Sequence, residues 1–136
     1  MNRGEMDHFD VFLSHAAPDL ALAQVVQQRL GDAKIVCRPS RSDAPASEYT
    51  DEHIQTVLDA SRAYVAIASR SSIQAPALFV EVGAASASKL PILFLLNDLA
   101  STDLPVFFKQ FPSFSLWKGF PRLIKALEKL PERVLA

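Results

Sequence analysis

Residues 64–96, YVAIASRSSIQAPALFVEVGAASASKLPILFLL, decide the fold class of this 136-residue chain. They hold two short apolar runs, Tyr64–Ala68 and Pro91–Leu96, on either side of a longer segment that begins at Pro76 and continues to about Ser88. Short continuous apolar runs are typical of strands buried on both faces, and proline is favoured in the first turn of a helix. The stretch therefore predicts a strand–helix–strand unit of a parallel sheet.

The same alternation continues on both sides of this unit. The pattern predicts further strands at Asp10–Ser14, Lys34–Cys37 and, at an edge, Phe114–Trp117, and helices at Asp19–Leu30, Glu48–Ala60 and Phe120–Leu130. Gly31 is a plausible stop for the first helix, Arg38–Ser47 a long polar loop, and Asn97–Gln110 a loop with a short helix. The prediction is an α/β, flavodoxin-like three-layer sandwich with a central, mostly parallel five-stranded sheet. Ligands of such sheets bind beyond the carboxyl ends of the strands.

Composition argues against several partners and compartments. Hydrophobic residues make up 49% of the chain and the formal net charge is −1, so a core is expected and no basic field attracts nucleic acid or an anionic membrane. The lone Cys37 has no intrachain disulfide partner, and Met1–Asp10 lacks the apolar region of a signal peptide. The run Leu90–Leu96 is far shorter than the roughly 18 residues of a membrane helix. We expect a cytoplasmic protein.

Several common kinds of site do not fit the residues of this sequence. No glycine lies in the turn directly after the first strand, which excludes a dinucleotide fingerprint and a phosphate loop. Ser14-His15 and Ala68-Ser69 stand where a phosphoacceptor receiver needs its aspartates. Ser14 and His15 are adjacent in a strand and point to opposite faces, so they cannot form a nucleophile–base pair. The histidines have no metal-ligand spacing, and we expect no metal.

Glu81 is the residue whose surroundings are least usual. It is the only charged residue between Arg70 and Lys89, and its helical neighbours are apolar. A lone carboxylate on a small, apolar helix is costly to bury unless it has a use or an unseen partner. The alternatives are that Glu81 points into solvent or bonds a backbone amide at a loop.

The ordered set of motifs resembles a Toll/interleukin receptor (TIR) domain of the bacterial, NAD-consuming type. Phe9-Asp-Val-Phe-Leu-Ser-His15 is similar to the family's first signature box, and Phe79-Val-Glu-Val-Gly-Ala84 to its Glu-Leu-Gly helix segment. The resemblance covers about Phe9 to Leu130 and implies one TIR-like domain in residues 1–136. Two features depart from the family: Ala77 stands where a tryptophan is usual, and the long loop has prolines in place of its usual glycine.

The resemblance implies a reaction and a catalytic residue. Enzymatic TIR domains cleave the bond between nicotinamide and ribose in NAD, which is a substrate, so no cofactor is implied. Glu81 matches the catalytic glutamate, which would stabilise the positive charge of an oxocarbenium transition state. The product would be ADP-ribose or a cyclic isomer. The alternatives are a non-catalytic adaptor that binds other TIR domains and a binder of nucleotide signals without turnover.

The resemblance also implies substrate-binding positions and partners. The implied substrate-binding positions are Ser14, His15, Asp19, Arg38, Ser69, Ser72 and Ala77. Five of them have a plainer alternative: Ser14 as a cap, Asp19 as a first-turn helix acid, Ser69 and Ser72 in a turn, and Arg38 as a solvated loop charge. The implied partners are NAD, other copies of the domain through TIR–TIR contacts, and a fused or separate sensor domain. The implied biological role is an immune, antiphage effector activated by self-association.

Overall fold

The computed structural model describes residues 9–41 and 51–130, with the backbone alone at 9–10, 38–41 and 51–53. Its central sheet is built from the strands β1 (Phe9–His15), β2 (Ile35–Arg41), β3 (Ala63–Ala68), β4 (Ile92–Leu96) and β5 (Ser113–Ser115). They lie in the order β2-β1-β3-β4-β5, and every neighbouring pair is parallel. The prediction of a flavodoxin-like α/β sandwich with five strands is confirmed.

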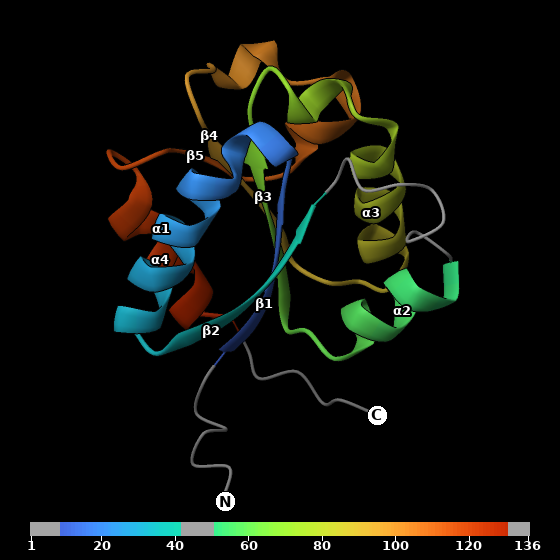
Figure 1. Ribbon diagram of the computed structural model, residues 1–136, viewed down its shortest axis with the longest axis horizontal. Coiled ribbons are helices and arrows are strands. Elements are labelled where there is room, and N and C mark those ends of the chain that lie inside the picture. The colour runs from blue at the N-terminus through green and yellow to red at the C-terminus, as the bar shows by residue number, and fades with distance from the viewer. Residues whose placement is uncertain (1–8, 42–50, 131–136) are drawn as a thin grey trace, which may run out of the picture.

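Helices cover both faces of this sheet (Figure 1). The helices α1 (Leu20–Asp32) and α4 (Phe120–Glu128) pack on one face, and α2 (Asp51–Asp59) and α3 (Pro76–Ala87) pack on the other. Short 3-10 helices lie between these elements, namely η2 (Ala17–Asp19), η4 (Ser72–Gln74), η5 (Ser101–Asp103) and η6 (Val106–Gln110). The arrangement is the three-layer sandwich that uninterrupted apolar strands require, because both faces of each strand must be covered.

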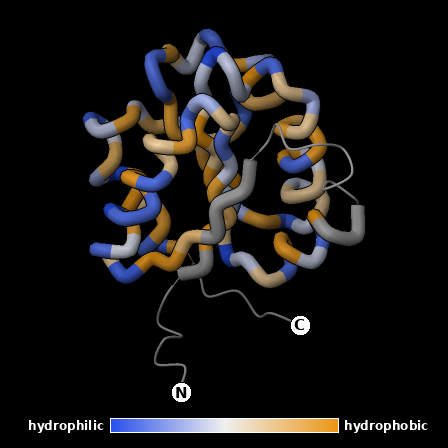
Figure 2. The backbone as a smooth tube through the Cα atoms, in the orientation of Figure 1, coloured by the Kyte–Doolittle hydropathy of each residue, from blue (hydrophilic) through white to orange (hydrophobic). Residues whose placement is uncertain are grey.

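The core consists of two clusters that share the central strands. Every residue of β3 and β4 is buried, and Figure 2 shows the most hydrophobic segments gathered at the centre of the molecule. Successive side chains of a strand point to opposite faces, so each strand contributes to both clusters. The Val65 side chain packs on the α1/α4 side, for example, and the adjacent Tyr64 packs on the α2/α3 side.

The chain changes direction across the sheet at β1. It passes from β1 to the edge strand β2 and then crosses to β3 on the other side of β1. Ser14 near the end of β1 lies opposite Ala66 of β3 in the register. The carboxyl ends of β1 and β3 therefore form the topological switch point where ligands of such sheets usually bind.

Three predicted boundaries were wrong. The helix α1 passes through Gly31 and ends at Asp32, because its terminal carbonyls are satisfied by the Ala33 N–H group and the turn is made at Lys34, whose φ is 67°. The strand β2 continues to Arg41, so the first part of the predicted loop Arg38–Ser47 extends the sheet, and residues 42–47 lie outside the described part of the chain. At the other edge β5 ends at Ser115, before Trp117 adopts a φ of 65°.

None of the helices within the described residues is both long and apolar enough to cross a bilayer.

Candidate functional site

Glu81 lies on the inner face of α3 and is completely buried. One of its oxygens, Oε1, accepts two hydrogen bonds, from the Ser14 hydroxyl at 2.6 Å and from the Tyr64 hydroxyl at 2.8 Å. Bonds of this length are typical of hydroxyl donors to a carboxylate. The alternative that Glu81 points into solvent is therefore wrong, and these two hydroxyl donors come from two different strands.

Two neighbouring strands bring these hydroxyls under α3. Ser14 is the penultimate residue of β1, and Tyr64 is the second residue of β3. Phe12 is the register partner of Tyr64 and lies two residues before Ser14, so all three side chains face α2 and α3. The Phe12 and Tyr64 rings are in contact, with centroids 5.3 Å apart. Glu81 thus lies over the β1–β3 pair, close to the switch point of the sheet.

Apolar side chains also surround Glu81. Leu78, Val82 and Ala85 of α3 are fully buried beside it, in the same cluster as Phe12 and Tyr64. These side chains exclude water from the carboxylate and offer it no hydrogen bonds. The two hydroxyl donors therefore offset part of the free-energy cost of removing the carboxylate from water. A carboxylate in a site of this kind interacts strongly with any positive charge that develops nearby, because the local dielectric is low.

A second hydrogen-bond network joins the loops after β1 and β3. The Ser69 hydroxyl donates to Asp19 Oδ2 at 2.6 Å, and its oxygen accepts from the Ser72 N–H at 3.2 Å. The Ser72 hydroxyl accepts from the Ser69 N–H at 2.9 Å and donates to the Ile67 carbonyl at 2.8 Å. Ser69 and Ser72 therefore hold their own turn. Asp19 is the acidic residue in the first turn of η2 and precedes α1 as its N-cap residue, without a side-chain cap hydrogen bond.

The remaining implied substrate positions are placed separately. His15 is buried, and its Nδ1 atom hydrogen-bonds the Ala16 carbonyl at 2.9 Å, on the opposite side of the strand from Ser14. Ala77 is half-buried one turn before Glu81 on α3. The Arg38 backbone belongs to β2, but its side chain lies outside the described residues, as do those of Arg41 and the rest of the predicted loop.

Tyr64 is the site residue that the sequence analysis did not single out. A signal for it was present, because Tyr64 begins an otherwise aliphatic strand, Val65–Ala68, that was predicted to be buried. A tyrosine that is fully buried almost always has a partner for its hydroxyl. A buried strand tyrosine and a lone helix glutamate are therefore natural candidates to pair.

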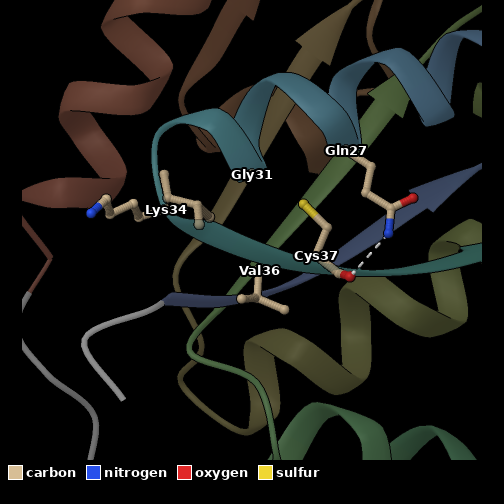
Figure 3. Close-up of a pocket in the computed structure, with 6 residues that line it drawn as sticks. Gln27, Gly31, Lys34, Val36 and Cys37 are labelled. Carbon is tan, nitrogen blue, oxygen red and sulfur yellow. Dashed lines mark hydrogen bonds between the residues drawn. The ribbon is translucent and has the colours of Figure 1, made fainter. Parts of the chain in front are cut away.

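No group of three or more histidine, cysteine, aspartate or glutamate side chains that could hold a metal ion occurs within residues 9–41 and 51–130. A pocket lies between α1 and β2, bordered by Gln27, Lys34 and Val36 (Figure 3). Gln27 Nε2 donates to the Cys37 carbonyl there, and burial raises the pKa of the Cys37 thiol to about 12. This pocket is on the face of the sheet opposite to Glu81.

Comparison with known proteins identifies the family of the chain. The family model described as TIR domain matches residues 11–130, which span β1 to the end of α4. No curated protein matches the chain significantly.

Proposed function

Since this chain belongs to the TIR domain family, we propose that it cleaves the nicotinamide–ribose bond of NAD, with Glu81 as the catalytic carboxylate. In this proposal the domain is an immune effector of bacterial, antiphage type that becomes active when copies of it associate. The substrate is NAD itself, and the reaction uses no further cofactor.

The burial of Glu81 is the observation that carries the proposal. Its side chain is 0% exposed and lies among apolar residues of α3 and the sheet. Burying a carboxylate among apolar side chains costs free energy, and two hydroxyl donors offset only part of that cost. A carboxylate at this position, hydrogen-bonded to Ser14 near the carboxyl end of β1, is therefore better explained by chemistry than by packing.

One carboxylate is sufficient for the reaction. The bond between the ribose C1′ atom and the nicotinamide nitrogen breaks, the electron pair leaves with the neutral ring, and positive charge develops on the ribose. Glu81 stabilises that charge and accepts hydrogen bonds from ribose hydroxyls. Water then adds to C1′ and loses a proton to give ADP-ribose, or a nucleophilic atom of the same molecule adds to give a cyclic isomer.

The implied substrate-binding residues have different roles in this mechanism. Ser14 contacts Glu81 directly, so we assign it to the nicotinamide end of the site together with the loop that begins at His15. Asp19 and Ser69, which hydrogen-bond each other, follow β1 and β3 in the chain, and we assign them to the ribose, whose hydroxyls would replace their mutual hydrogen bond. Ser72 already uses its hydroxyl to hold the turn. Arg38 is assigned to the phosphates, and the space beside Ala77 to a ring of the substrate.

A second candidate function is a non-catalytic adaptor. TIR domains mediate TIR–TIR interactions, and two observations favour this role here. Glu81 is fully covered, so a substrate reaches it only if covering groups move, and Ala77 stands where enzymes of the family usually have a tryptophan. If the chain is an enzyme, a neighbouring copy supplies that movement through its segment after β2.

The deciding experiment measures nicotinamide release from NAD by concentrated protein and by its Glu81→Gln variant. Gln keeps a carbonyl oxygen for the two hydroxyls but removes the negative charge, so we expect a loss of about 10²–10³-fold in rate. Glu128→Gln, at an exposed position of α4, is the matched control and should keep the parent rate. Folding of each variant is checked from its thermal midpoint.

The outcomes separate the two functions. Loss of release in Glu81→Gln alone, with a midpoint close to the parent's, supports the enzyme. A Glu81→Gln variant that turns over NAD at the parent rate removes Glu81 from the mechanism. A parent protein that releases no nicotinamide at any concentration, yet associates with itself in sedimentation, supports the adaptor.

A further inference from the structure

We infer that Tyr64 is a positioning residue for Glu81: it holds Oε1 throughout the reaction, while Ser14 exchanges its hydrogen bond with the substrate. This inference rests on the proposed NAD cleavage for its kinetic consequence. Its structural basis is that both hydroxyls donate to the same oxygen of the carboxylate.

Two donors on one oxygen fix the orientation of the carboxyl group. The last torsion of a glutamate side chain is broad, so a carboxylate without directed partners samples many orientations. The Ser14 and Tyr64 hydroxyls, arriving from adjacent strands, limit that rotation. A transition state is stabilised best by a group that is already oriented before the bond breaks, because no free energy is then spent on reorienting it.

Tyr64 is anchored in the middle of the sheet by its backbone and by its ring. Its N–H donates to the Pro91 carbonyl at 2.8 Å, and its strand is paired on both sides, with Phe12 and Ile92 as its register partners. Its side chain is 0% exposed, and its ring packs against that of Phe12. The phenol oxygen therefore cannot move away from Glu81 without disturbing the middle of the sheet.

Ser14 is placed differently. It stands at the carboxyl end of β1, one residue before the strand ends, at the edge of the sheet where ligands bind. A ribose hydroxyl that enters the site can replace the Ser14 hydroxyl as a donor to Glu81, so that the number of hydrogen bonds accepted by Glu81 stays the same. Tyr64 then supplies the donor that is constant before and after substrate binding.

The kinetic test compares Tyr64→Phe with Ser14→Ala. Phe keeps the ring and removes only the hydroxyl, so we expect kcat for nicotinamide release to fall roughly tenfold, the effect of one hydrogen bond to a charged group. KM for NAD should change by less than about twofold, because in this proposal Tyr64 does not touch the substrate. Ser14→Ala should instead change KM as well. Ser61→Ala, which removes another buried hydroxyl that donates to the Val57 carbonyl, is the matched control.

Two kinetic results would overturn the inference. One is a Tyr64→Phe variant with the parent kcat. The other is a variant whose activity falls only in proportion to the fraction of folded protein, which indicates a purely structural hydroxyl.

A spectroscopic test is independent of turnover. The chain has two tyrosines, Tyr49 and Tyr64, so a Tyr49→Phe background leaves Tyr64 as the only phenol. The tyrosine doublet in ultraviolet resonance Raman spectra should show a strong hydrogen-bond donor, and Glu81→Gln should shift it toward a weaker one. An unchanged doublet overturns the contact. If the parent protein releases no nicotinamide but the doublet responds, the proposed reaction fails while the Tyr64–Glu81 pair stands.

Discussion

The two faces of the sheet are covered in the same way but contain different chemistry. Under α1 and α4, the packed side chains at the middle of the sheet form an apolar cluster that includes Cys37, and the buried His15 lies at the end of β1 on the same face. Under α2 and α3, an apolar cluster of similar size surrounds the Glu81 carboxylate and the Ser14 and Tyr64 hydroxyls. One face is a core, and the other is a core with a polar centre.

This contrast between the faces explains how a small domain accommodates a buried carboxylate. A buried carboxylate weakens a core, so its cost must be offset by packing elsewhere in a molecule whose net stability is small. The strands connect the two faces energetically, because each strand contributes side chains to both of them. The apolar face therefore stabilises the sheet on which Tyr64 and Ser14 are presented to Glu81.

The largest expected effect comes from paired truncations, one on each face. Leu30→Ala under α1 and Leu78→Ala under α3 each remove a fully buried leucine, and each should lower the free energy of unfolding by about 2–5 kcal/mol. Only Leu78 lies one turn from Glu81, so only its variant should also lower the kcat of the folded protein. Chemical denaturation gives the stabilities, and nicotinamide release under fully folded conditions gives kcat. Equal effects of both variants on kcat would contradict the inference that only the α2/α3 face supports the reaction.

A smaller effect is expected from pH, through Cys37 on the apolar face. Burial raises the pKa of this thiol from 9.0 to about 12. Below about pH 9 the thiol is neutral in both the folded and the unfolded chain, so it adds no pH dependence. Above that value the unfolded thiol ionises while the folded one does not, so this contribution to stability falls as the pH rises toward 12.

The measurement compares the parent with Cys37→Val, which has no ionisable group at this position. From about pH 8 to about pH 10.5, the free energy of unfolding of the parent should fall by about 2 kcal/mol relative to the variant. Parallel curves would show that the thiol is hydrated in the folded state, and that the apolar face is less dry than its packing indicates.

The sequence predicts the framework of both faces well, because that framework depends on local patterns. Continuous apolar runs gave β1, β3 and β4, and their lengths agree with the structure to within a residue or two. Boundaries that depend on tertiary contacts were predicted less well. The polar residues Arg38 and Arg41 belong to β2 because β1 extends beside them to His15, a pairing that no local pattern in the sequence indicates.

The polar centre under α3 was predicted only in part, for the same reason. The isolation of Glu81 within its helix marked it as unusual, and the family motif indicated its role. Its partners, however, lie 67 and 17 residues away in the chain, and the helical neighbours gave no information about them. Adjacent strands of a parallel sheet bring Ser14 and Tyr64 together only after the crossover from β2 to β3 is known.

The smallest expected effect distinguishes the outer surfaces of the two helical layers. Gly31 on α1 and Gly83 on α3 are both exposed helix residues, and a Cβ added at either would meet nothing within 4 Å. Alanine at each position should therefore raise the free energy of unfolding by about 0.5–1 kcal/mol, the helix-propensity difference from glycine. Thermal or chemical denaturation of the two single variants measures this gain, and sedimentation with nicotinamide release measures association and activity. If both variants gain stability and keep the parent's association and activity, the two helical layers differ only in what they cover. If Gly83→Ala alone weakens association or activity, the outer surface of α3 is approached closely by another molecule, and the polar centre beneath it is sensitive to that contact. A loss of stability at Gly83 would instead show that its surroundings are more crowded than the structure indicates.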